Sequence, residues 1–562
     1  MNERELPRRS RAAVAAQLKN LLISLLSLTF TFALATPSAL ADPLLNNEIS
    51  AVDTEVGVVK SDVANINTDV GSALEISGVG EDDPLLEDLS RRTFQYFWDT
   101  TNKKTGLAPD RFPTPSWSSI AAIGFSLTAN VIGAERQYVK RAQASDRTLK
   151  ALRFLAKAPQ GPEPTGNAGY QGFYYHFLNA KDGLRASGSE LSTVDTALML
   201  GGVLLSQSYF DGPSRAEREI RKLADQIYQR VDWQWAQSRP PAISHGWMPE
   251  SGFLAHDWDG YNEAMLVYVL ALGSPTHAVD VDAWKQWTAS YDQNWGKFGG
   301  QELLSFGPLF GHQYSHVWVD FHGIQDEYMR AKGIDYFENS RRASYAQREY
   351  ANQNPMQWRG YDSKIWGLSA CDGPASTEQL YNGQKRGFYG YAGRGTTAVH
   401  SIDDGTIAPT AAIASIAFAP EIVIPTIHAF RDRYGDTLYK KYGFLDSINP
   451  SFTYTDVKMQ YGQIVGDVGW VATDYLGIDQ GPILAMIENY RSGLIWRVMQ
   501  KNPYVRRGLE RAGFTGGWLP PQPQPAAAAL PPEAEKKDSA VLAHNAGCAE
   551  RGCAEQSPLS EP

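Results

Sequence analysis

The sequence predicts a protein built almost entirely of helices, and two kinds of helix carry this prediction. Apolar residues recur at i, i+3, i+4 and i+7, whereas the alternation expected of strands scarcely appears. Segments with one apolar face alternate with segments that are apolar on most faces, which describes an outer layer around a buried inner one. Roughly a dozen such segments in about 430 residues, without a fixed sequence period, fit six helical hairpins. We therefore expect an all-α fold, an (α/α)6 toroid, rather than a two-domain bundle.

The individual helices follow from these two patterns. Helices with one apolar face and a charged opposite face are expected at residues 84–101, 145–158, 214–236 and 340–353. Helices that are apolar on most faces are expected at residues 118–134, 192–210, 262–273, 409–419 and 481–496. In a toroid, one end gathers the N-termini of the inner helices and the long loops before them. We expect the ligand site at that end.

The two ends of the chain differ from the body, which we place at residues 84–517. Residues 1–41 combine a basic start, an apolar run of about 15 residues and the small residues Ala39-Leu40-Ala41, as in a signal peptide cut after Ala41. An uncleaved anchor is the alternative. Residues 42–83 are expected to be a polar linker, and residues 518–562 a disordered Pro/Ala-rich tail. The protein is therefore expected to be periplasmic or secreted, with no membrane span in the mature chain.

Composition narrows the partners. The net charge of -10, with 52 Lys and Arg and no basic stripe, argues against nucleic acid. The 15 Trp, 27 Tyr and 22 Phe lie in many Gly-rich, loop-like contexts, which favours a neutral hydroxylated ligand. A large core that uses aromatics for volume is the alternative. With only three cysteines, disulfides do not hold the fold, although Cys548 and Cys553 can form a local one.

Polar, aromatic-rich stretches precede the predicted inner helices, and this coincidence is the strongest indication of a site. They lie at residues 183–195, 244–263, 306–321, 359–374, 400–409 and 442–482. Loops at matching places in a structural repeat converge on one cleft. Carboxylates in an aromatic cleft are what glycosidic bond hydrolysis requires, since one carboxyl protonates the leaving oxygen and another activates water.

Other chemistries lack their motifs. The chain has no G-x-S-x-G, Walker or dinucleotide-binding pattern. His312 and His316 have the i, i+4 spacing of a metal-binding pair, but no H-E-x-x-H accompanies them. Hydrogen bonding to substrate, or a place in the core, are the alternatives for these histidines. We expect no metal and no cofactor.

Glu263 is the candidate proton donor. It follows Trp258 and Tyr261 at the start of an apolar helix, where desolvation would raise its pKa, although a capping-box role fits its spacing equally well. Asp257 is expected to cap this helix. Asp195 lies in the first turn of another buried helix, where an acid is favoured by the helix dipole. Spacing alone does not decide which of these acids react.

At these motifs the chain resembles bacterial glycoamylase-like proteins, which include endo-β-1,2-glucanases and sophorose-releasing enzymes of glycoside hydrolase family 144. The resemblance lies in "STVDTALMLGG", "DWDGYNEAM", "PLFGHQYSHVWVDF", "YGFLDSIN" and "YLGIDQGPILAMIENYRSGLIW". It implies an (α/α)6 toroid, no required metal, and anomer-inverting hydrolysis of β-1,2-glucan. It also implies that Glu263 is the general acid and Asp446 the general base, with Glu190 or Asp195 as a further carboxylate. The family more often reads "YGFYDAFN" where this chain has "YGFLDSIN".

The remaining candidates are substrate contacts. Stacking on sugar rings is expected of Trp247, Trp258, Tyr261, Tyr314, Trp366 and Trp470. Polar contacts are expected of Glu190, Asp195, Asp259, His312, His316, Asp320, Asp362, Asp404, Asp479 and Gln480. The sequence thus predicts a glycoside hydrolase with a glucan oligo- or polysaccharide as substrate. The alternatives are another glucan linkage, an exo mode that releases sophorose, and a non-catalytic glucan-binding protein.

Overall fold

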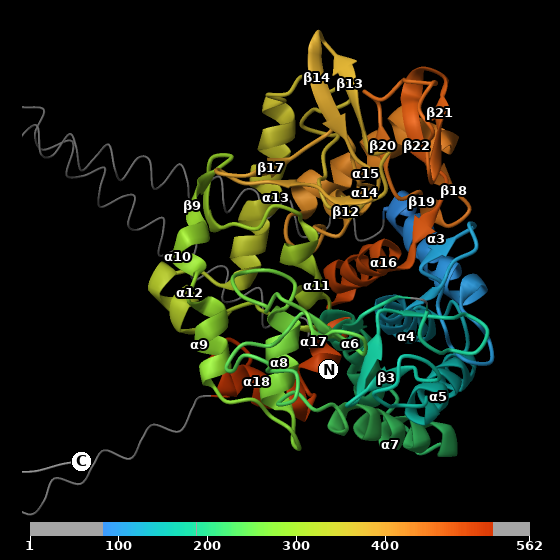
Figure 1. Cartoon of the computed structure of the whole chain (residues 1–562), viewed down its shortest axis with the longest axis vertical. Coiled ribbons are helices and arrows are strands. Elements are labelled where there is room, and N and C mark those ends of the chain that lie inside the picture. The colour runs from blue at the N-terminus through green and yellow to red at the C-terminus, as the bar shows by residue number, and fades with distance from the viewer. Residues whose placement is uncertain (1–82, 187, 521–562) are drawn as a thin grey trace, which may run out of the picture.

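The computed structural model describes residues 83–186 and 188–520, in which helices predominate and short strands lie in the connections (Figure 1). The predicted signal peptide, the predicted linker up to residue 82, and the tail from residue 521 with Cys548 and Cys553 lie outside the described residues. No helix within the described ranges has the length and apolar character needed to cross a membrane.

Six buried helices form the centre of the described structure. Each contacts the next along the chain, and the last contacts the first. The fourth and fifth are joined by a hydrogen bond from Gln313 Nε2 to Ala411 O (2.7 Å), and Gln313 Nε2 also donates to Ser415 Oγ just beyond the fifth helix (2.9 Å). These inner helices are α4 (Ile120–Glu135), α6 (Thr193–Tyr209), α8 (Met265–Gly273), α11 (Phe310–Trp318), α14 (Pro409–Ile413) and α16 (Gly477–Ser492).

Further helices lie outside this inner group, mostly around the periphery of the view in Figure 1. Several have charged outer faces, as the sequence predicts. The last of them, α18, packs against α8, so the C-terminal part of the described chain closes over a central element. They are α3 (Pro84–Thr100), α5 (Arg141–Lys157), α7 (Arg215–Gln229), α9 (Asp282–Thr288), α10 (Tyr291–Asn294), α12 (Glu327–Lys332), α13 (Tyr336–Gln353), α15 (Pro420–Leu438), α17 (Leu494–Met499) and α18 (Pro503–Arg511).

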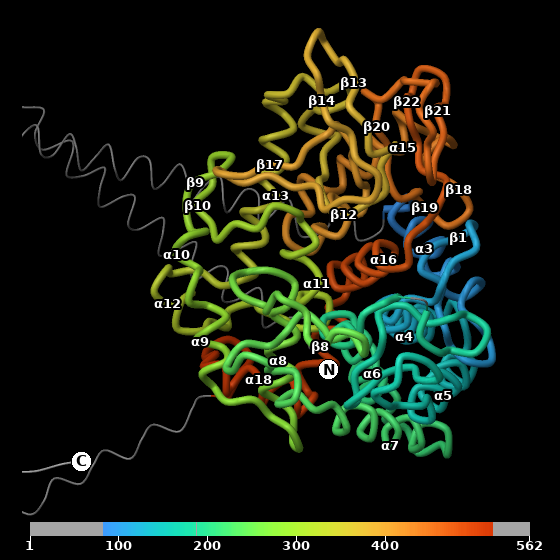
Figure 2. Tube along the Cα trace, viewed as in Figure 1, coloured from blue at the N-terminus to red at the C-terminus, as the bar shows by residue number. Residues whose placement is uncertain are grey.

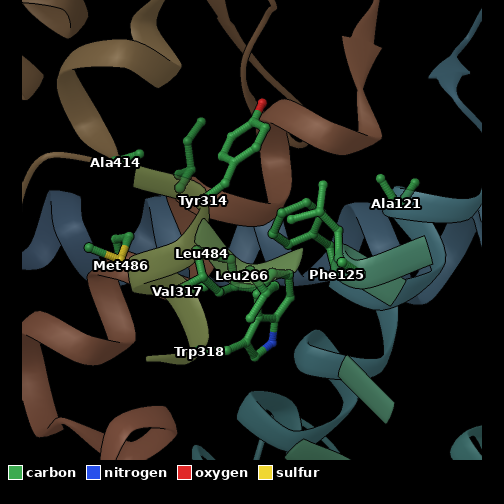
Figure 3. Packing of buried hydrophobic residues seen from close by; sticks show 14 of the residues in the cluster. Ala121, Phe125, Leu266, Tyr314, Val317, Trp318, Ala414, Leu484 and Met486 are labelled. Carbon is green, nitrogen blue, oxygen red and sulfur yellow. The ribbon is translucent and has the colours of Figure 1, made fainter. Parts of the chain in front are cut away.

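Glycines let the inner helices approach closely. A Cβ on Gly202 of α6 would lie 2.1 Å from Gly124 O of α4, and one on Gly481 of α16 would lie 2.1 Å from Phe125 Cγ of α4. Larger residues would force these helices apart. As a result, α16 lies beside α4 although Ile120 and Gly481 are 361 positions apart in the sequence (Figure 2). Figure 3 shows the core where α4, α8, α11 and α16 meet.

Short antiparallel strands lie between the helices, which the sequence pattern did not predict. A sheet of five strands leads into α6, in the order β3 (Gly169–Tyr170), β4 (Phe173–Tyr175), β6 (Leu191–Ser192), β7 (Gly246–Met248) and β8 (Gly252–Phe253). A sheet of three lies before α16, in the order β20 (Ile448–Asn449), β22 (Gly469–Ala472) and β21 (Gly462–Val465).

The other strands form two-stranded pairs. Strand β1 (Arg111–Phe112) pairs with β23 (Tyr475–Leu476), and β2 (Ser118–Ser119) pairs with β5 (Phe177–Leu178). The remaining pairs are β9 (Trp295–Phe298) with β10 (Gln301–Leu304), β11 (Ile324–Gln325) with β24 (Thr515–Gly516), β12 (Ala370–Cys371) with β15 (Ala392–Gly393), β13 (Thr377–Tyr381) with β14 (Gln384–Phe388), β16 (Gly395–Thr396) with β17 (Ser401–Ile402), and β18 (Tyr439–Lys440) with β19 (Gly443–Phe444). Runs this short carry too few residues to show an alternating pattern.

The structure corrects one element in particular. The stretch at residues 306–321 was expected to be a loop, but its middle forms the buried helix α11. Its histidines and glycine hide the apolar pattern, since every residue from Gly311 to Trp318 is buried. This helix completes the set of six inner helices.

Candidate active site

Two strand contacts bring distant acids together around Arg111. Pairing of β1 with β23 sets Arg111 opposite Leu476, and the Gly477 N–H donates to Asp110 O (2.7 Å) at the start of α16. The Asp446 N–H donates to Asp474 O (3.1 Å). The group defined in this way, the Arg111 cluster, consists of Asp110, Arg111, Asp372, Asp446, Asp474 and Asp479.

The Arg111 guanidinium compensates part of the negative charge in this cluster. Its Nη1 and Nη2 donate to the two carboxylate oxygens of Asp372, at 2.7 and 3.3 Å. Nη1 also lies 3.5 Å from Asp474 Oδ2, and Nε lies 3.6 Å from Asp110 Oδ2. Such two-pronged pairing is the strong form of an arginine–carboxylate contact. The single Arg111 cation therefore lies near three acids, Asp372, Asp474 and Asp110. Asp446 and Asp479 have no cation of their own.

Asp446 and Asp479 form a buried carboxyl pair. The Asp372 N–H donates to Asp446 Oδ2 (2.7 Å), whereas Asp446 Oδ1 and Asp479 Oδ2 receive no hydrogen bond from any other described residue. Burial, together with the Asp372 charge, raises the pKa of Asp446 to about 7. Burial and the Asp446 charge raise the pKa of Asp479 well above its usual range. The two carboxyls therefore titrate as a pair, and a proton that they share lets Asp446 ionise without a second charge beside it.

A second group of acids surrounds His176. In the antiparallel pairing of β4 with β6, the His176 N–H donates to Glu190 O (2.8 Å), which sets the two side chains next to each other. His176 Nδ1 lies 2.7 Å from Glu190 Oε1, and Nε2 lies 3.7 Å from Asp195 Oδ2. Burial opposes charge on the ring, but Asp195 and Glu190 prevail and raise the pKa of His176 to about 9. This His176 cluster (His176, Glu190 and Asp195) thus includes both carboxylates that the sequence left as alternatives.

Glu263 lies in the turn directly before α8 and has no counter-charge. Its Oε2 is buried and receives no hydrogen bond from the described residues. Burial, with a smaller contribution from the Asp195 charge, raises the pKa of Glu263 to about 7. The turn is held by its backbone, since Ser315 Oγ donates to Glu263 O (3.0 Å). Oε2 is therefore not held by another described residue, and the carboxyl keeps its proton up to about pH 7.

Tyr314 on α11 lies between the two clusters. In Figure 3 its ring extends from the core with the hydroxyl pointing away from the labelled apolar side chains. Burial raises the pKa of this phenol, and the charges of Asp479, Glu263 and Asp195 add to the shift. The Tyr314 phenol therefore interacts electrostatically with Asp479 of the Arg111 cluster and with Asp195 of the His176 cluster. We call the two clusters, Glu263 and Tyr314 together the central site.

Exposed aromatic rings border the Arg111 cluster. Tyr391 is 56% exposed, yet desolvation and the Asp479 and Asp446 carboxylates raise the pKa of its phenol, so its hydroxyl end lies toward these acids. Phe112 follows Arg111 directly, and Trp117 is 48% exposed on the loop whose Thr114 N–H donates to Asp474 Oδ1 (3.0 Å). Exposed rings beside carboxylates provide stacking surfaces for sugars.

Several predicted stacking residues are instead core residues. Trp366 and Trp470 are fully buried, and Trp366 Nε1 donates to Thr426 Oγ1 (2.8 Å). Trp258 is 7% exposed, stacks on His245 at 3.7 Å and donates to Thr193 Oγ1 (2.9 Å). These three indoles cannot stack on a ligand, because protein atoms cover their faces. Among the other rings, Trp247 is half-buried against Tyr170 and Trp235 (5.2 and 5.8 Å), and Tyr261 is buried against Tyr336 (5.8 Å).

The predicted histidine contacts are also wrong. His312 Nε2 accepts from the Phe306 N–H (3.2 Å), and His316 Nε2 lies 3.1 Å from Ser340 Oγ. Both rings are buried in the core, and burial lowers the pKa of His312 to about 3 and that of His316 well below its usual range. They remain neutral core histidines.

Most of the predicted polar contacts outside the two clusters serve the fold. Asp404 is buried against Arg394 (2.7 Å), Asp362 pairs with Arg433 (2.8 Å), and Gln480 Nε2 donates to Phe444 O (3.1 Å). Asp320 accepts from Gln500 (2.7 Å) just beyond the C-terminal end of α11, away from the helix N-termini. Asp257 pairs with Arg239 (2.6 Å) and does not cap α8, which has no side-chain cap. Asp259 is exposed beside a cavity described below.

The sequence analysis missed residues that complete the central site. They are Asp110, Arg111, His176, Asp372, Asp474 and Tyr391. None of them lies in a helix, and the contacts that gather them join residues up to 363 positions apart, as between Arg111 and Asp474.

The segments before the buried inner helices carry carboxyls that lack a cation and hold protons. This arrangement is typical of glycoside hydrolases, which act through a pair of carboxyl groups. Comparison with known proteins agrees. The family described as "Putative glucoamylase" matches residues 255–503. A Bacteroides uniformis protein of the same description has a crystal structure that is 32% identical, with a TM-score of 0.65, covering 78% of this chain and 99% of that one. The chain belongs to this glycoamylase-like family, as the sequence predicted.

Two further relatives carry names that state an activity. An endo-β-1,2-glucanase from Chitinophaga pinensis, solved with sophorotriose and glucose, is 28% identical, with a TM-score of 0.66, covering 78% of this chain and 99% of that one. An exo β-1,2-glucooligosaccharide sophorohydrolase (non-reducing end) from Parabacteroides distasonis is 26% identical over 464 residues, which are 76% of this chain. The chain spans 58% of the length of this curated relative.

Proposed function

We propose that the protein is a glycoside hydrolase that cleaves β-1,2-linked glucan with inversion of the anomeric configuration. The observation that carries the proposal is the pair Glu263 and Asp446, two buried carboxyls whose pKa values are each raised to about 7 by burial. Each has one oxygen that no other described residue satisfies. An acid that holds its proton and a base that can take one are the two groups that an inverting mechanism needs.

In this mechanism, Glu263 supplies the proton that the leaving oxygen requires. Its Oε2 is buried and uncompensated, so the carboxyl still holds its proton near neutral pH, where a carboxyl with its usual pKa would already have lost it. Asp446 accepts a proton from the attacking water. The Asp372 N–H fixes one Asp446 oxygen at 2.7 Å and leaves Oδ1 available for that water, with Asp479 as a neutral neighbour.

The linkage and the mode of attack rest on the named relatives. Both relatives act on β-1,2-linked glucan or its oligosaccharides by name, one as an endo enzyme and one as an exo enzyme. We propose an endo mode for this chain, as in the Chitinophaga pinensis enzyme, with which it shares 28% identity and a TM-score of 0.66. The exo mode is the alternative, and the products of hydrolysis distinguish the two.

Two further proposals accompany the function. The six inner helices that contact one another in a closed order, with helices outside them, support an (α/α)6 toroid. The basic and apolar start of the chain, with small residues at Ala39-Leu40-Ala41, supports export to the periplasm or beyond. Fractionation of cells that express the full chain, with N-terminal sequencing of the product, tests cleavage after Ala41.

The decisive experiment is incubation of the purified protein with linear β-1,2-glucan and, in parallel, with β-1,3-, β-1,4- and α-1,4-glucans. We expect oligosaccharides only from β-1,2-glucan, with a mixture of lengths early in the reaction and α-anomers as the first products by NMR. Release of sophorose alone from the start would favour the exo mode. Binding of β-1,2-glucan without hydrolysis would overturn the enzymatic proposal in favour of a glucan-binding protein.

A further inference from the structure

A cavity of about 540 Å³, which we call the side pocket, lies next to Glu263. Tyr261 and Asn262, the two residues before Glu263, form part of its wall. The other walls come from residues 290–294, 305–308 and 393–402. Its volume falls in the range of about 300–1,000 Å³ that is typical of small-molecule sites. None of the residues that carry the proposed chemistry lines it, so the side pocket is distinct from the central site.

The chemistry of its lining suits a neutral, hydroxylated ligand. Neither lysine nor arginine is among the described residues that line it, and Asp259 is the one carboxylate. The other polar groups are mainly amides and hydroxyls, including Asn262, Ser290, Gln293 and Asn294, with glycine backbone between them. A phosphate or an acidic ligand would need cationic partners. Sugar hydroxyls, which both donate and accept, match amides and hydroxyls instead.

These polar side chains are free to bind. Ser290, Gln293 and Asn294 make no side-chain hydrogen bond to any described residue. Two of them converge on one point, because a Cβ built on Gly260 would lie 3.0 Å from Ser290 Oγ and 4.0 Å from Asn294 Nδ2. Gly260 has a φ of +67°, so this position favours glycine and leaves the space open.

A row of aromatic rings connects the side pocket to the central site. Phe306 lines the pocket and lies 5.6 Å from Phe310, which lies 5.2 Å from Tyr314. Phe310 and Tyr314 lie four positions apart on α11, so their rings share one face of the helix, and Phe306 lies in the segment before it. Tyr314 ends the row among Glu263, Asp195 and Asp479. Phe306 and Phe310 are only partly buried and can stack on sugar rings, so they lead from the side pocket toward the buried Tyr314.

We propose that the side pocket binds glucosyl residues of the same glucan chain beyond those held at Glu263, and so makes hydrolysis depend on chain length. This role rests on the proposed function. Long chains reach both the central site and the side pocket, whereas the shortest substrates reach the central site alone. The added contacts raise kcat/KM for long chains without changing the reacting groups.

The test is the double variant Gln293→Ala/Asn294→Ala, with Gln286→Ala as the control. Gln286 is an exposed amide on the neighbouring helix α9, it has no side-chain hydrogen bond to the described residues, and it does not line the side pocket. The quantity measured is the ratio of kcat/KM on long β-1,2-glucan to kcat/KM on the shortest oligosaccharide that is cut. We expect the double variant to lower this ratio about tenfold, since it removes two hydrogen-bonding side chains, and the control to leave it unchanged.

Calorimetric binding of long β-1,2-glucan to the Glu263→Gln protein, with and without the two pocket substitutions, gives a second readout that needs no turnover. We expect about tenfold weaker binding when the pocket is altered. An unchanged ratio together with unchanged affinity would overturn the side-pocket proposal while leaving the proposed function intact. A wild-type protein that neither cuts nor binds β-1,2-glucan would overturn both.

Discussion

The Arg111 cluster and the surroundings of Glu263 both bury carboxyls, but they treat the charge in opposite ways. Around Arg111, a guanidinium spans Asp372 and approaches Asp474 and Asp110, and the Asp372 N–H donates to Asp446. Glu263 has neither a cation nor another residue's donor at Oε2, and Asp195, the charge that acts on it, is itself paired with His176.

This difference separates the two proposed roles. A buried carboxyl without a neighbouring cation keeps its proton because desolvation disfavours the charged form, and a general acid needs this proton. A carboxyl that shares a proton with a neighbour and accepts a backbone hydrogen bond can ionise while remaining buried, which suits a general base. Burial is the largest cause of the raised pKa, about 7, of both Glu263 and Asp446, but the like charge that adds to it is Asp195 for Glu263 and Asp372 for Asp446. Substitutions that remove one contribution at a time test the comparison.

The largest effect is expected from the two proposed catalytic residues. Glu263→Gln and Asp446→Asn should each lower kcat/KM on β-1,2-glucan by roughly 10²–10⁴-fold, because each removes a proton transfer. Thermal unfolding should show that both variants remain folded. Asp257→Asn is the control, since Asp257 pairs with Arg239 outside the central site. Near-normal hydrolysis by either catalytic variant would mean that the acid or the base is assigned to the wrong residue.

The next effect concerns the single cation that serves the Arg111 cluster. Arg111→Met should lower the free energy of unfolding by roughly 3–5 kcal/mol, because it leaves Asp372 buried without its partner. It should also raise the pKa of Asp446, which Arg111 now lowers, and so move the acidic limb of kcat/KM to higher pH. Chemical denaturation and a pH profile measure these two changes.

The matched control for that substitution is Arg239→Met. Arg239 forms the same kind of two-oxygen contact, with Asp257 at 2.6 Å for both bonds, but at the surface. Exposed pairs contribute little to stability, so unfolding of this variant should change little. If the two variants lost equal stability, the Arg111 cluster would not differ electrostatically from an ordinary surface pair.

The sequence predicted the helices of this site better than its electrostatics. The strongly apolar inner helices and the amphipathic outer ones follow from hydrophobic periodicity, which is local information. The helix α11 was missed because histidines and a glycine occupy positions that the core buries. Trp366 and Trp470 were misplaced for a related reason, since composition does not tell a buried indole from one that lines a cleft.

The charged residues of the site show even more clearly that local sequence patterns do not reveal contacts made in the folded structure. Glu263 stood out because its neighbours along the chain are aromatic, and Asp446 was found only through the resemblance. His176 and Arg111 carry no local signal, because pairing of β4 with β6 and of β1 with β23 creates their contacts. Strands of two or three residues leave no pattern in a single sequence.

A third, smaller effect is the pH dependence of stability. The pKa of Asp446 is raised from 3.8 to about 7 in the folded protein, so the folded state binds the proton more tightly than the unfolded state does. Its contribution is therefore complete below about pH 4 and is lost as the pH rises toward 7. Asp446→Asn removes this loss and should be more stable than the wild type at pH 8 by roughly 1–3 kcal/mol, with a smaller gain at pH 4. Denaturation at both pH values measures the difference, and a gain that was larger at pH 4 would contradict the raised pKa.

The smallest effect separates the two acids of the His176 cluster. Glu263 must be protonated to act, so kcat/KM should fall as the pH rises through about 7. The negative charge of Asp195 helps to raise this pKa, and Asp195→Asn should therefore move the alkaline limb to lower pH by roughly half a unit. Glu190→Gln is the matched control, because Glu190 also pairs with His176 but does not contribute to the Glu263 shift. If the alkaline limb moved with Glu190→Gln and not with Asp195→Asn, then Glu190 rather than Asp195 would be the carboxylate that raises the pKa of Glu263.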